Sequence, residues 1–299
     1  MKKLTCAVLT MMFLISALPA LADSAPALYR VEDQAGHHIY LLGAVHVGSA
    51  DMYPLGDAFE AAWQDAQALA VEMDADALET DMLRLMKYAA ATVYTDGDTA
   101  KNHLSPEAYA LGVEKLGQPE YLLNRMRPFI WASLAENALF EQMGFSAEYG
   151  VDSFLTKRAK EEQKPVIEME GLDAQLAIIQ NVPDEVSESI LLSMLLLPDE
   201  AEKSMSGMME AYISGDAEAL EIWLETDTSD FPEELAATFE AYNNMLYHDR
   251  NDGFARQAEE YLQEGKTVLI CIGAAHILGE DGLVNQLKAA GYTVTEINH

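Results

Sequence analysis

The chain has 299 residues, and its 50 acidic against 18 basic side chains give a formal net charge of −32 at pH 7. A charge of this size and sign repels nucleic acid and anionic membrane surfaces, so we expect neither as a partner. Half of the residues are hydrophobic, and the chain is long enough to bury a substantial core.

Residues 1–22 have the pattern of a secretory signal peptide. Lys2 and Lys3 precede a short apolar stretch, and Ala20-Leu21-Ala22 forms a small-residue cleavage site. The apolar stretch is too short to be taken as a membrane span. We therefore expect export across the inner membrane to the periplasm, and a mature domain of residues 23–299. Cys271 would then be the only cysteine left, which excludes an intramolecular disulfide.

Short apolar runs that predict strands alternate along the chain with long stretches of helical periodicity. In chain order, the predicted strands are residues 28–31, 39–42, 68–71, 165–168, 267–272 and 293–297. The predicted helices are residues 57–67, 76–91, a helix starting at Ser105-Pro106, 128–142, 151–162, most of 173–264, and 282–290. The pattern predicts an α/β fold, with a small central sheet built from the start, middle and end of the chain. Large helical insertions are expected at about 76–162 and 184–262.

One motif occurs twice, once near each end of the chain. The strand at 39–42 is followed by Gly43-Ala-Val-His46, and the strand at 267–272 by Gly273-Ala-Ala-His276. Each glycine is expected to let the backbone turn sharply as it leaves the sheet. Ligands of open α/β sheets bind outside the carboxyl ends of the strands. A single histidine at such a place often only caps a turn, but two in matching contexts predict one shared site.

Two glutamates follow the ends of other predicted strands. Glu72 comes directly after residues 68–71, and Glu170 comes shortly after residues 165–168. If these strands are parallel, their ends place His46, Glu72, Glu170 and His276 around one crevice. Such a set can hold a divalent metal with open positions for water. It can equally act without metal, as a histidine base and a glutamate acid. The spacing does not separate these two readings.

A further pair, Arg250-Asn251, lies in a predicted helix. An arginine there can bind a carboxylate or stabilise an oxyanion, or it can form a surface salt bridge. The chain lacks His-Glu-x-x-His, Gly-x-Ser-x-Gly, a Walker loop and paired Cys-x-x-Cys motifs. Zincin, serine-hydrolase, nucleotide-binding and zinc-ribbon functions therefore lose support.

The whole mature chain resembles the TraB/GumN family, which is related to the Tiki metalloproteases and more distantly to erythromycin esterases and ChaN-like proteins. The matching segments are Leu41-Leu-Gly-Ala-Val-His46 with Tyr53-Pro-Leu55, Val71-Glu-Met-Asp74, Gly150-Val-Asp152 with Arg158-Ala159, Lys164-Pro-Val-Ile-Glu-Met-Glu170 with Gln175, Arg250-Asn251, Gly273-Ala-Ala-His-Ile-Leu-Gly-Glu-Asp-Gly282, and Gly291-Tyr-Thr-Val294. One departure is Ala44, where relatives more often carry threonine. Alanine lacks the threonine hydroxyl, a group that could hydrogen-bond a metal-binding residue and hold it in orientation.

The resemblance implies a sheet with helical insertions and a pocket between the two Gly-x-x-His turns. Tiki relatives are metal-dependent peptidases that work with manganese or cobalt. Erythromycin esterases are thought to use a histidine base without a required metal, ChaN-like proteins bind haem, and some TraB-type members inhibit peptide pheromone signalling. Because the family is functionally divergent, the fold alone does not settle the activity.

From these observations we expect an exported, metal-dependent hydrolase that cleaves peptide bonds, with a peptide or small molecule as substrate. His46, His276 and Glu72 would hold manganese, cobalt or zinc, Glu72 doubling as ligand or general base. Glu170 would support this set, and Arg250 and Asn251 would orient substrate or stabilise the oxyanion. The alternatives are a metal-free esterase with a histidine base, and a non-catalytic protein that sequesters a peptide, haem or metal.

Overall fold

The computed structural model describes residues 25–225, 228–229 and 231–297. The expected signal peptide, residues 1–22, lies outside the described residues. Among the helices that are described, none combines the length and the apolar character needed to cross a bilayer.

The described strands form one mixed sheet in the order β4-β3-β5-β2-β1-β6. Their bounds are β1 Leu28–Glu32, β2 His38–Ala44, β3 Ala68–Val71, β4 Val166–Glu168, β5 Val268–Gly273 and β6 Thr293–Glu296. β4, β3, β5 and β2 run parallel, and β1 pairs antiparallel with both β2 and β6. β3 is buried throughout and β5 almost so, while β6 at the edge is mostly exposed. Strands buried on both faces read as continuous apolar runs, which is why the sequence pattern revealed them.

Helices fill the segments between the strands. They are α1 Asp57–Asp65, α2 Ala75–Thr80, α3 Met82–Thr92, α4 Pro106–Lys115, α5 Glu120–Leu123, α6 Pro128–Gln142, α7 Val151–Glu161, α8 Leu172–Asn181, α9 Asp184–Leu196, α10 Pro198–Ser214, α11 Ala217–Leu224, α12 Glu233–Asn243, α13 Asp249–Gln263, α14 Ala274–Ile277 and α15 Leu283–Ala289. A π-helical segment, η4 Asn244–His248, joins α12 to α13, and short 3₁₀ turns lie at Ala50–Met52, Ala100–Asn102 and Ala147–Tyr149. The predicted α/β fold with helical insertions is confirmed.

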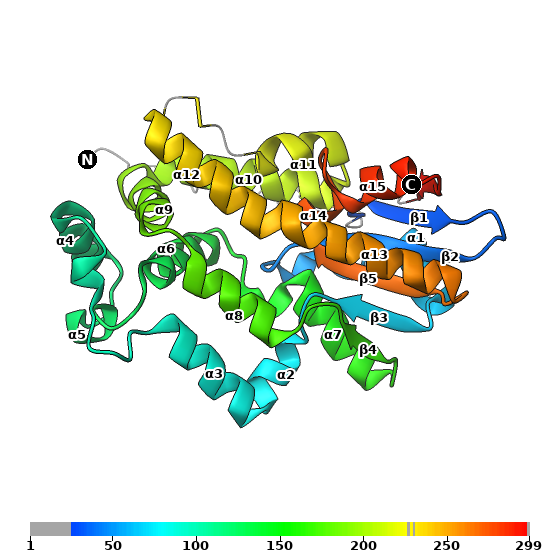
Figure 1. Cartoon of the computed structure of the whole chain (residues 1–299), viewed down its shortest axis with the longest axis horizontal. Helices are drawn as coiled ribbons and strands as arrows, with labels where there is room; N and C mark the ends of the chain where they lie inside the picture. The colour runs from blue at the N-terminus through cyan, green and yellow to red at the C-terminus, as the bar shows by residue number, and fades with distance from the viewer. Residues whose placement is uncertain (1–24, 226–227, 230, 298–299) are drawn as a thin grey trace, which may run out of the picture.

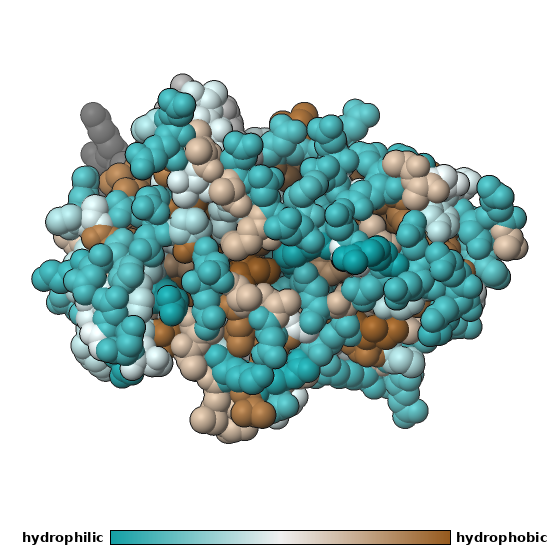
Figure 2. All heavy atoms as spheres, in the orientation of Figure 1, coloured by the Kyte–Doolittle hydropathy of each residue, from teal (hydrophilic) through white to brown (hydrophobic). Residues whose placement is uncertain are grey.

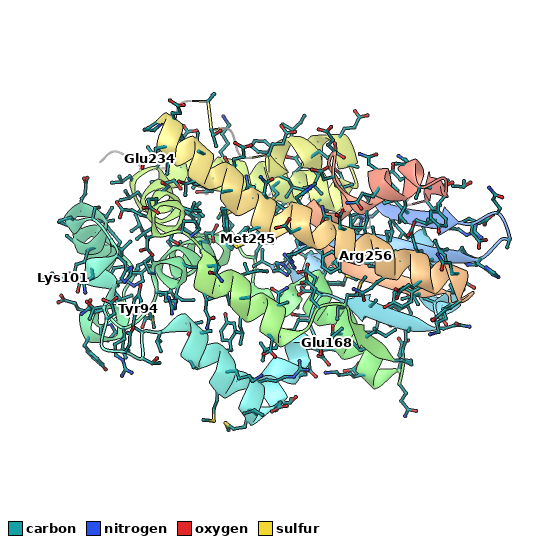
Figure 3. The ribbon with its side chains drawn as sticks, in the orientation of Figure 1. Tyr94, Lys101, Glu168, Glu234, Met245 and Arg256 are labelled. Atoms are coloured by element: carbon teal, nitrogen blue, oxygen red, sulfur yellow. The ribbon has the colours of Figure 1, made fainter. Side chains whose placement is uncertain are left out.

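The sheet lies at one end of the molecule and most of the inserted helices at the other (Figure 1). One long helical run, α12-η4-α13, crosses from the helical end onto the sheet; Met245 lies near its middle and Arg256 on the part that covers the sheet (Figure 3). The main core joins the sheet to α1, α7, α10 and α13 through residues such as Trp63, Leu155, Tyr212 and Phe254. The sheet and this crossing run bring segments from distant parts of the sequence to one place.

Two local features differ from the expectations. The helix predicted over 76–91 is two helices, because Asp81 ends α2 and its side chain accepts the Leu83 and Arg84 N–H groups at the start of α3. Gly43 does not turn the chain out of the sheet: it lies inside β2, paired with Ile272 of β5, and packs against Ala274 of α14. A Cβ on Gly43 would come within 2.9 Å of the Ala274 Cα, so close packing is what requires glycine there.

Candidate functional site

The polar residues of the candidate site follow the carboxyl ends of the four parallel strands. His46 comes two residues after β2, Glu72 directly after β3, and Glu170 two residues after β4. His276 lies in α14, the short helix that begins where β5 ends. The parallel pairing therefore collects residues that are up to 230 positions apart at one edge of the sheet.

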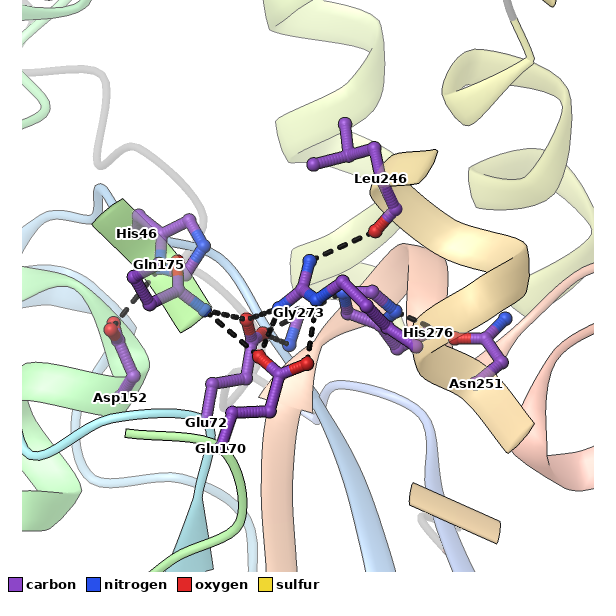
Figure 4. Close-up of polar contacts among 10 residues, drawn as sticks. His46, Glu72, Asp152, Glu170, Gln175, Leu246, Asn251, Gly273 and His276 are labelled. Carbon is purple, nitrogen blue, oxygen red and sulfur yellow. Dashed lines mark hydrogen bonds and ion pairs between the residues drawn. The ribbon is translucent and has the colours of Figure 1, made fainter. Parts of the chain in front are cut away.

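Arg250 joins the two glutamates into one ion-paired group (Figure 4). Its Nη2 donates to Glu72 Oε2 and, at 2.7 Å, to Glu170 Oε2, while its Nε donates to Glu170 Oε1 at 2.8 Å. The remaining Nη1 donates at 2.9 Å to the Leu246 carbonyl in the π-helical segment. All three side chains are nearly buried, with 11–14% of their surface exposed. Every nitrogen of the guanidinium therefore donates to an acceptor within the protein.

Two neutral donors complete the coordination of the carboxylates. Gln175 on α8 donates at 3.1 Å to both Glu72 and Glu170, and the Gly273 N–H donates to Glu72 Oε1 at 2.7 Å. Burial raises the pKa of Glu72, but nearby positive charge and the Gly273 N–H outweigh it and hold that pKa below its usual range. Glu72 is thus an anion at neutral pH.

His276 is held by Asn251, and the contacts assign its tautomer. The Asn251 Nδ2 donates to the Asp281 carbonyl at 2.9 Å, so the Asn251 Oδ1 faces the His276 Nδ1 at 2.6 Å. An amide oxygen only accepts, so the His276 Nδ1 carries the hydrogen. Burial lowers the pKa of His276 to about 4, although the negative charge of Glu72 acts to raise it. At pH 7 the ring is neutral, and its Nε2 presents a lone pair.

That lone pair faces a second electron-pair donor. The His276 Nε2 lies 4.0 Å from the Glu72 Oε1, too far for a hydrogen bond. Tyr247 and Phe254 pack edge-on against the imidazole, with ring centroids 5.5 Å and 5.0 Å away, and hold it in this orientation. Only 4% of the His276 side chain is exposed.

His46 has a different environment. Its Nδ1 lies 3.1 Å from Asp152 Oδ2 on α7, and 69% of its side chain is exposed. The Asp152 carboxylate raises the pKa of His46 above its ordinary value of 6.5. Solvent around the exposed ring screens part of this effect. In Figure 4, His46 with Asp152 and His276 with Asn251 lie on opposite sides of the two glutamates.

A cavity of about 190 Å³ connects several of these residues. It is lined by His46, Val71, Glu72, Met73, Asp152, Gln175, Cys271, Ile272 and Gly273. His46 and Glu72 therefore share one space, while His276 reaches Glu72 from the opposite side. In the part of the chain that the structure describes, no three His, Cys, Asp or Glu side chains stand close enough together to hold a metal ion.

The sequence analysis assigned no role to Asp152 or Gln175, although both lie in segments that carry the family resemblance. Asp152 anchors His46, and Gln175 bridges the two glutamates. Asn251 uses its amide for His276 and for the Asp281 carbonyl. The order of residues along the chain could not reveal these pairings, because each joins segments at least 25 positions apart or depends on a side-chain direction. Only the resemblance drew attention to Asp152 and Gln175.

A model of the TraB/PrgY/gumN family matches residues 27–296. This chain belongs to the TraB/PrgY/gumN family. It is 27% identical over 256 residues to the protein named Uncharacterized protein YbaP of Escherichia coli strain K12, covering 84% of this chain and 88% of that one. The protein of the same name from Shigella flexneri matches with the same identity and coverage. No solved structure matches the chain.

For this TraB/PrgY/gumN family member, the family match spans both Gly-x-x-His segments, both glutamates and Arg250. The relatives' names state no activity. Any chemistry for the site must therefore be argued from its own geometry.

Proposed function

We propose that this protein is a metal-dependent hydrolase that cleaves peptide bonds, with His276 and Glu72 as the pair that would hold a divalent ion and His46, on the other side of Glu72, as a third ligand that would have to move toward the ion on binding. One observation carries the proposal. The His276 Nε2 lone pair and the Glu72 Oε1 face each other at 4.0 Å with no hydrogen to share. Two opposed electron-pair donors at that spacing suit a cation between them, since metal-to-ligand distances for nitrogen and oxygen are about 2.0–2.2 Å.

The partners of both imidazoles support the same reading. Metal-binding histidines usually donate their second ring N–H to a carboxylate or another acceptor. The Nδ1 of His276 has Asn251 as such an acceptor, and the Nδ1 of His46 has Asp152. Both rings therefore have Nε2 left for a ligand role. Asp152 stabilises the protonated form of His46, whereas a metal ligand must be neutral. Metal binding would therefore release a proton from His46.

We assign Arg250, Glu170 and Asn251 to positioning. Arg250 has every nitrogen engaged with protein acceptors, so it compensates and aligns Glu72 and Glu170 rather than contacting the substrate. Asn251 orients the His276 ring. A bound divalent ion would lower the pKa of a water molecule and polarise the scissile carbonyl. The neutral His276 and the anionic Glu72 would keep their charge states across the neutral pH range.

A metal-free esterase is the second candidate, and a different observation favours it. Arg250 already pairs with both glutamates and compensates one of their two negative charges, and the described residues bring no three metal ligands together. In this case the His276 Nε2 would accept a proton from water as a general base. We further propose that either enzyme acts in the periplasm, where a signal peptide at residues 1–22 would direct it.

The deciding experiment measures metal content and hydrolysis together. The purified protein is stripped with a chelator, assayed on peptide and ester libraries, and then reloaded with manganese, cobalt or zinc. We expect peptide hydrolysis to disappear on stripping and to return with metal. Full activity in chelator, with esters preferred over peptides, would establish the second candidate instead. Binding of peptide, haem or metal without any turnover would overturn both.

His276→Ala and the matched control His37→Ala make the experiment specific. His37 is a surface histidine whose Nδ1 pairs with Asp33, far from the carboxyl edge of the parallel strands. Loss of metal and activity in His276→Ala, with both retained in His37→Ala, is the expected result. Equal metal content in the two variants would contradict the ligand assignment.

A further inference from the structure

The side chain of His103 lies between two carboxylates that come from different elements. Its Nδ1 lies 2.6 Å from the Oδ2 of Asp184, the first residue of α9, and its Nε2 lies 2.9 Å from the Oδ2 of Asp98, in the loop after α3. Ionised carboxylates only accept hydrogen bonds, so each contact requires a hydrogen on the facing ring nitrogen. Both contacts are therefore satisfied only when the imidazole is doubly protonated and positively charged.

The surroundings of His103 favour this charged form. Burial lowers the pKa of His103, but the hydrogen bonds and charges of Asp98 and Asp184 outweigh burial and raise that pKa above its ordinary value of 6.5. Tyr94 stacks on the imidazole, with the ring centroids 4.8 Å apart and the ring planes at 17°. Arg127, directly before α6, brings an opposing charge, but it lies over the Tyr94 ring at 5.0 Å, whereas the carboxylates contact His103 directly.

His103 joins the segment of residues 94–105 to helix α9. In the part of the chain that the structure describes, two polar contacts connect them. One is the His103–Asp184 pair, and the other is the Ser105 N–H, which donates to Glu188 at 2.7 Å. Loss of the first contact would therefore leave a single polar contact between this segment and α9.

An apolar core lies beside this joint and holds the segment independently of pH. Leu191 of α9 packs with Ala100 and Leu104, and none of these side chains titrates. A change of protonation would therefore loosen the joint without detaching the segment. Tyr94 and Lys101 mark the segment at the helical end of the molecule in Figure 3, and the surface around them is mostly hydrophilic in Figure 2. Solvent protons can thus reach the joint.

The joint also forms one wall of a cavity of about 300 Å³. Tyr94, His103 and Asp184 line this cavity together with Arg127 and the residues that begin α6. The end of α8 contributes only neutral side chains to it. The shape of this cavity therefore depends on whether the joint is closed.

We propose that His103 is a pH-sensitive latch that clamps the 94–105 segment to α9 and releases it when the ring loses a proton as the pH rises. Deprotonation leaves a nitrogen lone pair facing a carboxylate where a hydrogen bond had been. The stabilising contribution of the latch is fully present below the unfolded pKa of about 6.5 and is lost as the pH rises through the higher folded pKa. The inference is independent of the proposed function, because none of these residues belongs to the candidate site.

An NMR pH titration of the full-length protein tests the latch. At low pH, both ring nitrogens of His103 should carry hydrogens, and the measured pKa should lie above 6.5. Amide hydrogen exchange of residues 99–105, corrected for its intrinsic pH dependence, should become faster above that pKa. The increase should be about tenfold for each unit by which the pKa exceeds 6.5. A pKa at or below 6.5, or exchange that does not change as His103 titrates, would overturn the proposal.

Two variants and a control assign the effect to the latch. Asp184→Asn should lower the pKa of His103 and shrink the change in exchange, and His103→Gln should abolish that change. His37→Gln alters a surface histidine that pairs with Asp33 and should retain the full change. A change that persists in His103→Gln, or disappears in His37→Gln, would belong to another group and would refute the latch. The titration of the unaltered protein decides the question even if a variant fails to fold.

Discussion

The Nε2 atom of His276 faces the Oε1 atom of Glu72 at 4.0 Å, and neither atom has a hydrogen to offer the other. Asn251 creates this arrangement because its Oδ1 accepts a hydrogen bond from the Nδ1–H of His276. That is the only ring hydrogen of the neutral imidazole, so Nε2 carries none. Glu72 is held in place by Arg250, Gln175 and the Gly273 N–H. The site is therefore built around two fixed electron-pair donors.

Removing the Asn251 amide should impair the site while leaving the fold intact. We expect Asn251→Ala to lower metal affinity or activity by about 10- to 100-fold, the usual effect of losing a partner that orients a metal-binding histidine. Titration calorimetry with manganese and the hydrolase assay measure it. Asn285→Ala is the control, because the exposed Asn285 only donates to the Gly279 carbonyl. Unchanged affinity in Asn251→Ala would refute the positioning role.

Removing Arg250 should destabilise the protein. Arg250→Ala leaves Glu72 and Glu170 as a nearly buried, uncompensated pair of anions, and we expect a loss of about 3–5 kcal/mol in the free energy of unfolding. Urea denaturation measures this loss. Arg250→Ala/Glu170→Gln removes one of the two charges and should recover part of it. A double variant no more stable than the single one would show that packing, rather than charge, causes the loss.

The His46–Asp152 pair should give the protein a pH-dependent contribution to stability. The pKa of His46 is raised in the folded state, so its stabilising contribution is fully present below the unfolded value of about 6.5. The contribution is lost as the pH rises through the folded pKa. NMR titration of the His46 ring should show a pKa above 6.5, falling back toward 6.5 in Asp152→Asn. An unchanged His46 titration in Asp152→Asn would contradict this assignment.

The close approach of β2 and α14 should make Gly43 intolerant of a side chain. In Gly43→Ala the new Cβ would lie 2.9 Å from the Ala274 Cα and must displace the helix that carries His276. We expect a loss of about 1–3 kcal/mol, the usual cost of overpacking, together with lower activity. Thermal unfolding and the hydrolase assay measure both.

Gly253→Ala is the matched control for that substitution. Gly253 lies within α13, and a Cβ there meets no atom within 4 Å. Alanine favours the helix by about 1 kcal/mol over glycine, so this variant should be slightly more stable than the parent. If both variants changed stability equally, the tight contact at Gly43 would not be the cause.

Much of the fold could be predicted because the relevant signals are local. Apolar runs such as residues 268–272 mark strands that are buried on both faces, and helical periodicity marks amphipathic helices such as α7 and α13. The sequence pattern did not predict the break between α2 and α3. Both flanking stretches are helical, and the only signal is the capping preference of Asp81.

By itself, the sequence determined which side chains follow the strand ends, and hence that His46, Glu72, Glu170 and His276 would gather at one edge once the strands ran parallel. Only the tertiary structure decided how each is held: Arg250 between the two glutamates, Asn251 behind His276 and Asp152 beside His46. The reason is physical. Strand formation depends on neighbours along the chain, whereas a hydrogen bond depends on the direction of two side chains from different elements, which is set when those elements pack together.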